Sequence, residues 1–139
     1  MVDQVITKPI TADALMAFEA ADQRYEVVNG QLVEVIMAGE LHGAIATNLI
    51  VAIGSFVKKQ QLGRVYPGDT TFVLAGKSEE IQIARLPDIA FVAKSRLKTT
   101  EREGFYYQAP DLAIEVISPY AKGFLRSSSI PLVLSLPTS

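Results

Sequence analysis

The sequence predicts a single domain of mixed α/β class. Its 139 residues suit one domain rather than two. Two stretches have apolar side chains at helical spacing, and several short strand-like stretches lie between turn residues. Because 49% of the residues are apolar and 20% are charged, the composition is that of a globular protein able to bury its own core.

The N-terminal part predicts a short helix followed by a β-hairpin. Residues 11–22 begin with Thr11, whose hydroxyl can cap a helix, and their apolar side chains recur at helical spacing. Strand-like residues 25–28 and 31–36 flank the pair Asn29-Gly30. This pair tolerates the two positive φ angles of a type I′ turn, so we expect a tight hairpin.

Residues 41–62 predict the main helix, because their apolar positions follow a period near 3.6. Lysines and glutamines at 58–61 suit its C-terminal end, and Gly63 is expected to close it. The longest apolar stretch, around residues 45–57, is broken by Thr47, Asn48, Gly54 and Ser55. We expect this stretch to be too short and too interrupted to span a bilayer, and the protein to be soluble.

The second half predicts strands separated by turns and loops. The expected strands are residues 65–66, 71–74, 85–93 and 112–118. The expected connections are a Pro67-Gly68-Asp69 turn, a polar turn at 76–80 and a basic loop at 94–108. Pro87 donates no ladder hydrogen bond, so it must lie at a strand start or edge.

The composition changes after Pro119. Residues 123–139 contain three consecutive serines, two prolines and no acidic residue. We therefore divide the chain into a domain at 1–119 and an atypical tail at 120–139.

Cysteine and charge limit the classes of function. With no cysteine, the chain has neither a disulfide framework nor a thiolate metal site. A net charge of -2 provides no global basic field for nucleic acid, so DNA contacts would need a local patch. The N-terminus lacks the pattern of a secretory signal. We expect a cytoplasmic protein without a membrane partner.

Two carboxylates are the strongest candidates for chemistry. Glu115 lies within an apolar strand, where an ionised group is costly unless it is paired or binds a cation. Asp88 directly follows Pro87 in another strand-like segment. Carboxylates on neighbouring strands can share a divalent cation such as Mg²⁺. The alternatives are a solvent-facing Glu115 on an edge strand and a turn-proximal Asp88.

Four segments of the chain occur in the order and spacing of a known protein family. They are residues 25–32, His42, residues 86–92 and residues 109–119. Over residues 11–119 the chain resembles the Uma-two restriction-endonuclease family, a branch of the PD-(D/E)XK nuclease superfamily. The resemblance implies a restriction-endonuclease-like core, with a mixed central sheet flanked by helices and the acidic pair near its centre. It also implies hydrolysis of DNA phosphodiester bonds.

The resemblance assigns roles to particular residues. Asp88 and Glu115 match the two motif acids and would bind Mg²⁺ or Mn²⁺. Glu26 and His42 match positions that line the same site. A surface charge on the hairpin is the alternative for Glu26. For His42 we favour the alternative, a residue at the helix start that contacts the backbone.

The chain departs from the motif at its lysine. Ile117 stands where the lysine of (D/E)XK is expected. Lys122 is a candidate substitute, and Arg126 is the other cation nearby. Loss of one transition-state stabiliser commonly costs about 10²–10³ in rate.

Three functions remain open on the sequence alone. The favoured one is a metal-dependent DNA endonuclease, impaired by the lost lysine. The second is a catalytically silent, truncated relative that acts as an interaction module. The third is a nucleic-acid-binding domain that uses the basic loop, whose cations are Lys94, Arg96, Lys98 and Arg102. For this loop we favour the alternative of a solvated charged loop, in which Glu101 and Glu103 balance the cations. For Tyr106 and Tyr107 of this loop, packing under the loop is favoured over stacking on bases. An apolar sheet face left uncovered would favour a homo-oligomer.

Overall fold

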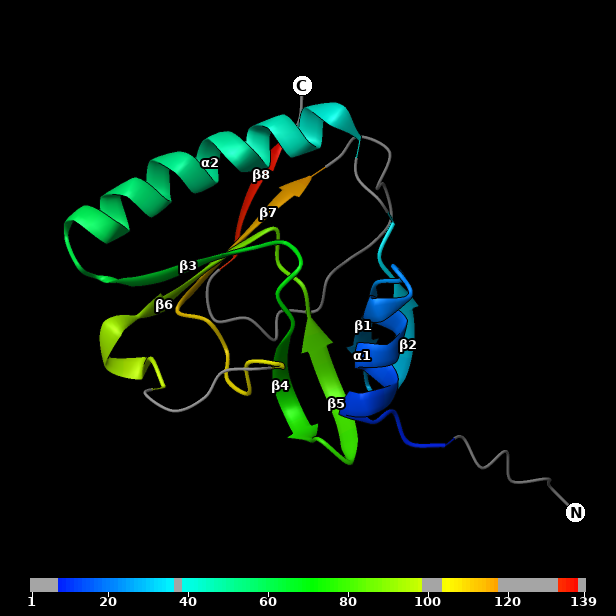
Figure 1. The fold of residues 1–139 in the computed structure, drawn as a ribbon. Helices are drawn as coiled ribbons and strands as arrows, with labels where there is room; N and C mark the ends of the chain where they lie inside the picture. Colours follow the sequence, from blue (N-terminus) through cyan, green and yellow to red (C-terminus); the bar gives the residue numbers. More distant parts are fainter. Residues whose placement is uncertain (1–7, 37–38, 99–103, 118–132, 138–139) are drawn as a thin grey trace, which may run out of the picture.

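The computed structural model describes residues 8–36, 39–98, 104–117 and 133–137. These residues form an α+β fold of two helices and two four-stranded sheets, which confirms the predicted class (Figure 1). The helices are α1 (Ala12–Ala20) and α2 (Glu40–Lys59), with a 3₁₀ turn η1 (Lys94–Arg96). The strands are β1 (Tyr25–Val28), β2 (Gln31–Glu34), β3 (Gly63–Pro67), β4 (Phe72–Lys77), β5 (Glu80–Arg85), β6 (Ile89–Ala93), β7 (Leu112–Ile117) and β8 (Val133–Pro137). The strands divide between two four-stranded sheets.

The first sheet has the strand order β2-β1-β5-β4 and is antiparallel throughout. The expected hairpin is present, with φ of 50° at Asn29 and 74° at Gly30. Helix α1 packs on this sheet through Leu15, which is fully buried against Val27 and Ile81. Its N-terminus is capped as expected, because the Thr11 hydroxyl accepts a hydrogen bond from the Ala14 N–H at 3.1 Å.

The second sheet has the order β3-β6-β7-β8. Strands β3, β6 and β7 pair antiparallel, whereas β8 pairs parallel to β7, so this sheet is mixed. The tail therefore contributes a strand, although its sequence predicted no continuation of the domain. Strands β6 and β7, which carry or adjoin the acidic pair, are the two central strands.

The predicted strand at 85–93 is wrong in its bounds, because it covers parts of two strands in different sheets. Strand β5 ends at Arg85, and β6 begins at Ile89. Between them, residues 86–88 carry the chain from the first sheet to the second. Pro87 suits this crossing because it cannot donate to a ladder. Asp88 consequently lies just before a strand and not within one.

Helix α2 ends three residues earlier than expected. Gln61, and not Gly63, adopts the left-handed conformation after the helix, with φ of 54°. The Leu62 N–H donates to the Val57 carbonyl at 3.0 Å and the Gln61 N–H to the Lys58 carbonyl at 3.3 Å, which is a Schellman motif. Gly63 instead begins β3, where an added Cβ would collide with the Val92 carbonyl.

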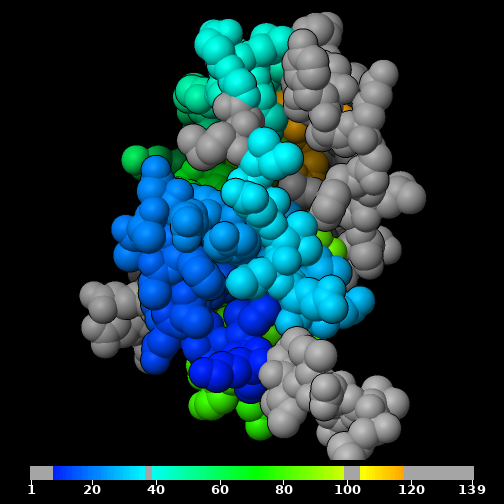
Figure 2. Space-filling model, turned by 90° about the vertical axis from the view of Figure 1, so that its right-hand side faces the viewer, coloured from blue at the N-terminus to red at the C-terminus, as the bar shows by residue number. Residues whose placement is uncertain are grey.

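Helix α2 lies over the second sheet and contacts β3, β6 and β7 (Figure 1). In the view of Figure 2, α1 and the β1–β2 hairpin form the near face, and the start of α2 stands above them. Only Val57 of α2 is buried, whereas Val51 and Phe56 are 62% and 59% exposed. Self-association through such side chains stays a prediction.

Helix α2 is longer than the apolar stretch at 45–57, and the expectation that it does not span a bilayer stays a prediction. By length and composition alone, α2 could cross a membrane. The reason is that Thr47, Asn48, Gly54 and Ser55 are uncharged and do not interrupt the helix. A helix of a soluble protein can pass the same test, so this property is weak support for a membrane span.

Candidate active site

Strands β6 and β7, which adjoin Asp88 and contain Glu115, pair antiparallel. Ile89 pairs with Ile114, and Ala90 pairs with Ala113. Asp88 lies in the bend directly before β6, and Glu115 directly follows Ile114 on β7, so the two acids adjoin the same end of this strand pair.

Asp88 is held by two donors from different elements. Its Oδ2 accepts a hydrogen bond from the Val116 N–H of β7 at 2.7 Å. The Nε2 atom of His42, in the first turn of α2, lies 3.2 Å from the same oxygen. The side chains of His42 and Asp88 are 16% and 20% exposed, so the pair is shielded but reachable by solvent. The interpretation of His42 as a residue that contacts the backbone is wrong.

Glu115 lies in the interior of the second sheet. The residue is 7% exposed, and its strand β7 is flanked by β6 and β8. The alternative of a carboxylate on the solvent face of an edge strand is therefore wrong. A carboxylate buried to this degree is costly unless other groups or a cation compensate it.

Glu26 is buried beneath the segment that leads to Asp88. The residue is 2% exposed, so the surface-charge alternative is wrong. Its Oε2 accepts a hydrogen bond from the Leu86 N–H at 3.2 Å and lies 3.8 Å from the Arg85 guanidinium. Glu26 thus fixes the backbone two residues before Asp88, which is a positioning role.

The donor set fits a hard divalent cation in its chemistry. Asp88 and Glu115 supply carboxylate oxygens, and Mg²⁺ commonly uses one or two carboxylates while it keeps several waters. In the described part of the chain, no group of three or more His, Cys, Asp or Glu side chains is placed to hold a metal ion. Asp88 and Glu115 are the residues that would hold such an ion, and water would complete its coordination.

The position of the motif lysine is occupied by an apolar side chain. Ile117 is 47% exposed at the end of β7. Lys122 and Arg126, the two cations that could replace the lysine, lie outside the described residues.

The cations of the basic loop are of two kinds: one is bound within the protein, and others are exposed to solvent. Arg96 forms a salt bridge with Asp111 at 2.7 Å and donates to the Ala109 carbonyl at 2.7 Å, so its guanidinium is engaged within the protein. Lys94 and Lys98 are exposed, and Arg102 lies outside the described residues.

Of the two neighbouring tyrosines of the loop, Tyr106 is buried and Tyr107 is exposed. Tyr106 is 8% exposed and packs on Phe72, as favoured from the sequence. Its hydroxyl donates to the Arg96 carbonyl at 2.8 Å, and burial raises the pKa of Tyr106. Tyr107 is 37% exposed.

Asp111 is a polar anchor that sequence reasoning did not single out. Its Oδ2 accepts the Ala93 N–H at 2.7 Å, and its Oδ1 meets Arg96. Burial alone would raise its pKa, but the Ala93 N–H and the Arg96 guanidinium hold the pKa of Asp111 below its ordinary value. The presence of Arg96 and Asp111 at the two ends of one connecting segment is the sequence feature that could have predicted this salt bridge.

Comparison with known proteins agrees with the fold and the motif order. The model of the Uma2 family, described as "Putative restriction endonuclease", matches residues 12–127. A crystal structure described as a "putative nuclease belonging to DUF820" from Anabaena variabilis is similar, with 25% sequence identity and a TM-score of 0.64. That match covers 83% of this chain and 62% of the other, so the chain spans less than two thirds of its structural relative. No curated protein matches the chain.

The family match includes every segment on which the sequence resemblance depended, and it extends past β7. Because it covers most of the 139 residues, the chain belongs to the Uma2 family.

Proposed function

We propose that the protein is a divalent-metal-dependent endonuclease that hydrolyses phosphodiester bonds of DNA. The observation that supports the proposal is the contact of the Asp88 carboxylate with His42 and with the N–H of Val116, the residue next to Glu115 on β7. The description of the Uma2 family and that of the DUF820 structure support the same class of reaction.

Each group of the chain has a defined part in this chemistry. In the hydrolysis, a water oxygen bonds to phosphorus, one ester P–O bond breaks, and the leaving oxygen takes up a proton. A bound Mg²⁺ or Mn²⁺ supplies positive charge that polarises a phosphoryl oxygen. Asp88 and Glu115 bind this ion, and His42 orients Asp88. Glu26 keeps the segment before Asp88 in place through its bond to the Leu86 N–H.

Nicking of supercoiled plasmid DNA tests the proposal. We expect cleavage with Mg²⁺ or Mn²⁺ and none with EDTA. Asp88→Asn and Glu115→Gln preserve side-chain size and should each abolish nicking, whereas Glu34→Gln on the exposed face of β2 should leave it unchanged. Nicking that survives in both site variants would show that these acids do not perform the reaction.

A catalytically silent relative that still binds the ion is the second candidate. It is favoured by Ile117, which provides no charge where the motif has a lysine. In this case Mn²⁺ should raise the melting temperature of the wild type but not of Asp88→Asn, and plasmid DNA should remain intact. Cleavage by the wild type that disappears in Lys122→Gln would exclude this candidate and identify the replacement cation.

A further inference from the structure

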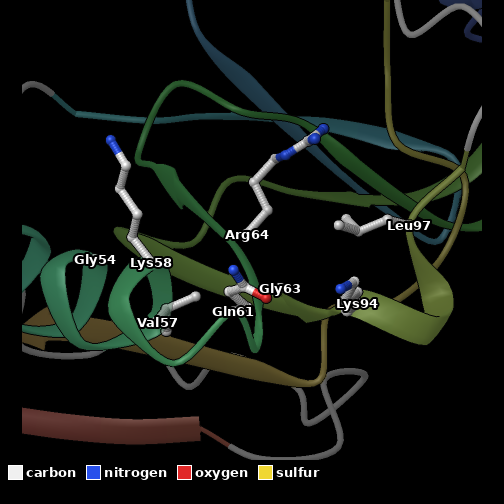
Figure 3. Close-up of a pocket in the computed structure, with 8 residues that line it drawn as sticks. All are labelled: Gly54, Val57, Lys58, Gln61, Gly63, Arg64, Lys94 and Leu97. Carbon is white, nitrogen blue, oxygen red and sulfur yellow. The ribbon is translucent and has the colours of Figure 1, made fainter.

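A groove lined by cations lies far from the acidic pair. It has a volume of about 510 Å³ and is formed by the last turns of α2, the start of β3, and η1. Three of its eight lining residues are the cations Lys58, Arg64 and Lys94, and none is acidic. In Figure 3 the side chains of Lys58 and Arg64 extend to the same side of β3.

The charge in this groove is not explained by the fold. The chain as a whole carries a net charge of -2, so three cations around one groove are a local departure. Among the described residues, none of these three forms a salt bridge; the recorded pairs involve other cations. Lys58 in the last turn of α2 can offset the negative end of the helix dipole. That effect does not account for Arg64 and Lys94.

Two of the residues that line the groove are the glycines Gly54 and Gly63. A Cβ added at Gly54 would meet nothing within 4 Å, so the helix side of the groove is empty space. At Gly63 the backbone has a φ of 154° and approaches β6 so closely that any Cβ would collide with the Val92 carbonyl.

The groove and the acidic pair lie at opposite ends of the same elements. Asp88 precedes β6 and Lys94 follows it, so six residue steps along the strand separate them by about 20 Å. His42 and Lys58 lie sixteen residues apart on α2, which corresponds to about 24 Å. Because each nucleotide of one strand adds about 3.4 Å along the axis of a duplex, this separation corresponds to roughly six nucleotides.

We propose that Lys58, Arg64 and Lys94 form an anchoring site for the phosphate backbone of nucleic acid, about six nucleotides from the bond that is cleaved. The inference rests on the proposed nuclease function, because it assigns the groove to the same substrate. Backbone contacts of this kind position nucleic acid without reading its sequence. The groove thus supplies the local basic patch that the net charge of the chain does not provide.

The test measures binding of a fluorescently labelled 20-base-pair duplex by anisotropy, in EDTA, over a series of KCl concentrations. The double variant Arg64→Gln/Lys94→Gln is compared with the control Lys8→Gln/Lys77→Gln, which removes the same charge from exposed positions elsewhere. Each lost phosphate contact lowers the slope of log K against log[salt] by about 0.9. We expect the slope of the groove variant to be smaller in magnitude by about 1.8 than that of the wild type. Between 50 and 200 mM salt, the affinity of the wild type should therefore fall by a factor roughly tenfold larger than the affinity of the variant.

The outcomes separate this inference from the nuclease proposal. An unchanged slope in the groove variant, or an equal change in the control, would overturn the anchoring site even if plasmid nicking depends on Asp88. A groove variant with the predicted slope change supports the site even if no nicking occurs. If millimolar inorganic phosphate raises the melting temperature of the wild type but not of the groove variant, and duplex binding is equal in both, the groove is a small-anion site and the inference fails.

Discussion

Removal of the Glu26 carboxylate should strongly destabilise the fold. Glu26 and Arg85 lie on the adjacent strands β1 and β5, and the side chain of each is 3% exposed. Their charged atoms are 3.8 Å apart, and the same Glu26 oxygen accepts the Leu86 N–H. Glu26→Ala therefore removes a charge partner of a buried arginine and the acceptor of a buried N–H in one step.

The size of the effect follows from burial. Removing one member of a buried ion pair costs about 3–5 kcal/mol, because the other charge stays in a poorly solvated place. This is a large part of the roughly 5–15 kcal/mol that stabilises a typical domain. Glu26→Gln should cost less, because its amide oxygen can still accept the Leu86 N–H. Replacing both partners, as in Glu26→Leu/Arg85→Met, should give a protein more stable than either single variant.

Urea unfolding followed by far-UV circular dichroism measures these differences. Glu34→Ala, an exposed position on β2, is the matched control and should change the free energy of unfolding by less than about 0.5 kcal/mol. A Glu26→Ala variant as stable as this control would refute the reasoning. So would a double variant that is less stable than both single variants.

Three further predictions concern His42, the helix glycine and the loop salt bridge. His42→Ala should weaken Mn²⁺ binding by about 10- to 100-fold, because Asp88 loses the imidazole ring that lies 3.2 Å away. His42→Gln should restore part of the lost affinity. If calorimetry gives the same Mn²⁺ affinity for the wild type and both variants, His42 has no positioning role. Gly54→Ala should stabilise α2 by about 0.5–1 kcal/mol because a Cβ there meets nothing, and a lower Tm would contradict this. Arg96→Ala should cost about 1–2 kcal/mol in urea unfolding, since its two bonds of 2.7 Å are partly exposed and screened. The folded pKa of Asp111 is lowered, so its contribution is present above the ordinary value of 3.8 and is lost as the pH falls through the folded value. Stability should therefore fall below about pH 4 less steeply in Asp111→Asn than in the wild type, and identical acid profiles would contradict the assignment.

Local chemistry made much of the fold predictable. Asn29-Gly30 fixes a hairpin because its turn demands two positive φ angles, and Thr11 caps α1 with its own hydroxyl. Strand β5 was missed although residues 80–83 alternate between polar and apolar side chains, since Glu80 was assigned to a turn. The end of α2 was also misjudged, because Gln61 takes the left-handed conformation that glycine usually provides.

The site depended on contacts between distant residues. Asp88 and Glu115 were identified by type and motif order, but His42 lies 46 residues from Asp88, and no local pattern reveals that they touch. Glu26 meets Arg85 only because β1 pairs with β5. The hairpin sequence alone contains no sign of this pairing and is equally compatible with an exposed Glu26.

The cation groove has the same origin in long-range contacts. Its three cations come from α2, β3 and η1, and only the packed fold brings them together. No signal in the sequence links Arg64 to the other two.

The most direct test of the central claim is the location of Mn²⁺ in crystals of the protein, from its anomalous scattering. We predict one peak within about 2.0–2.6 Å of carboxylate oxygens from both Asp88 and Glu115. The peak should be absent from crystals of Asp88→Asn. A Mn²⁺ bound elsewhere, or by only one of the two acids with the other turned away, would contradict a shared metal site between β6 and β7.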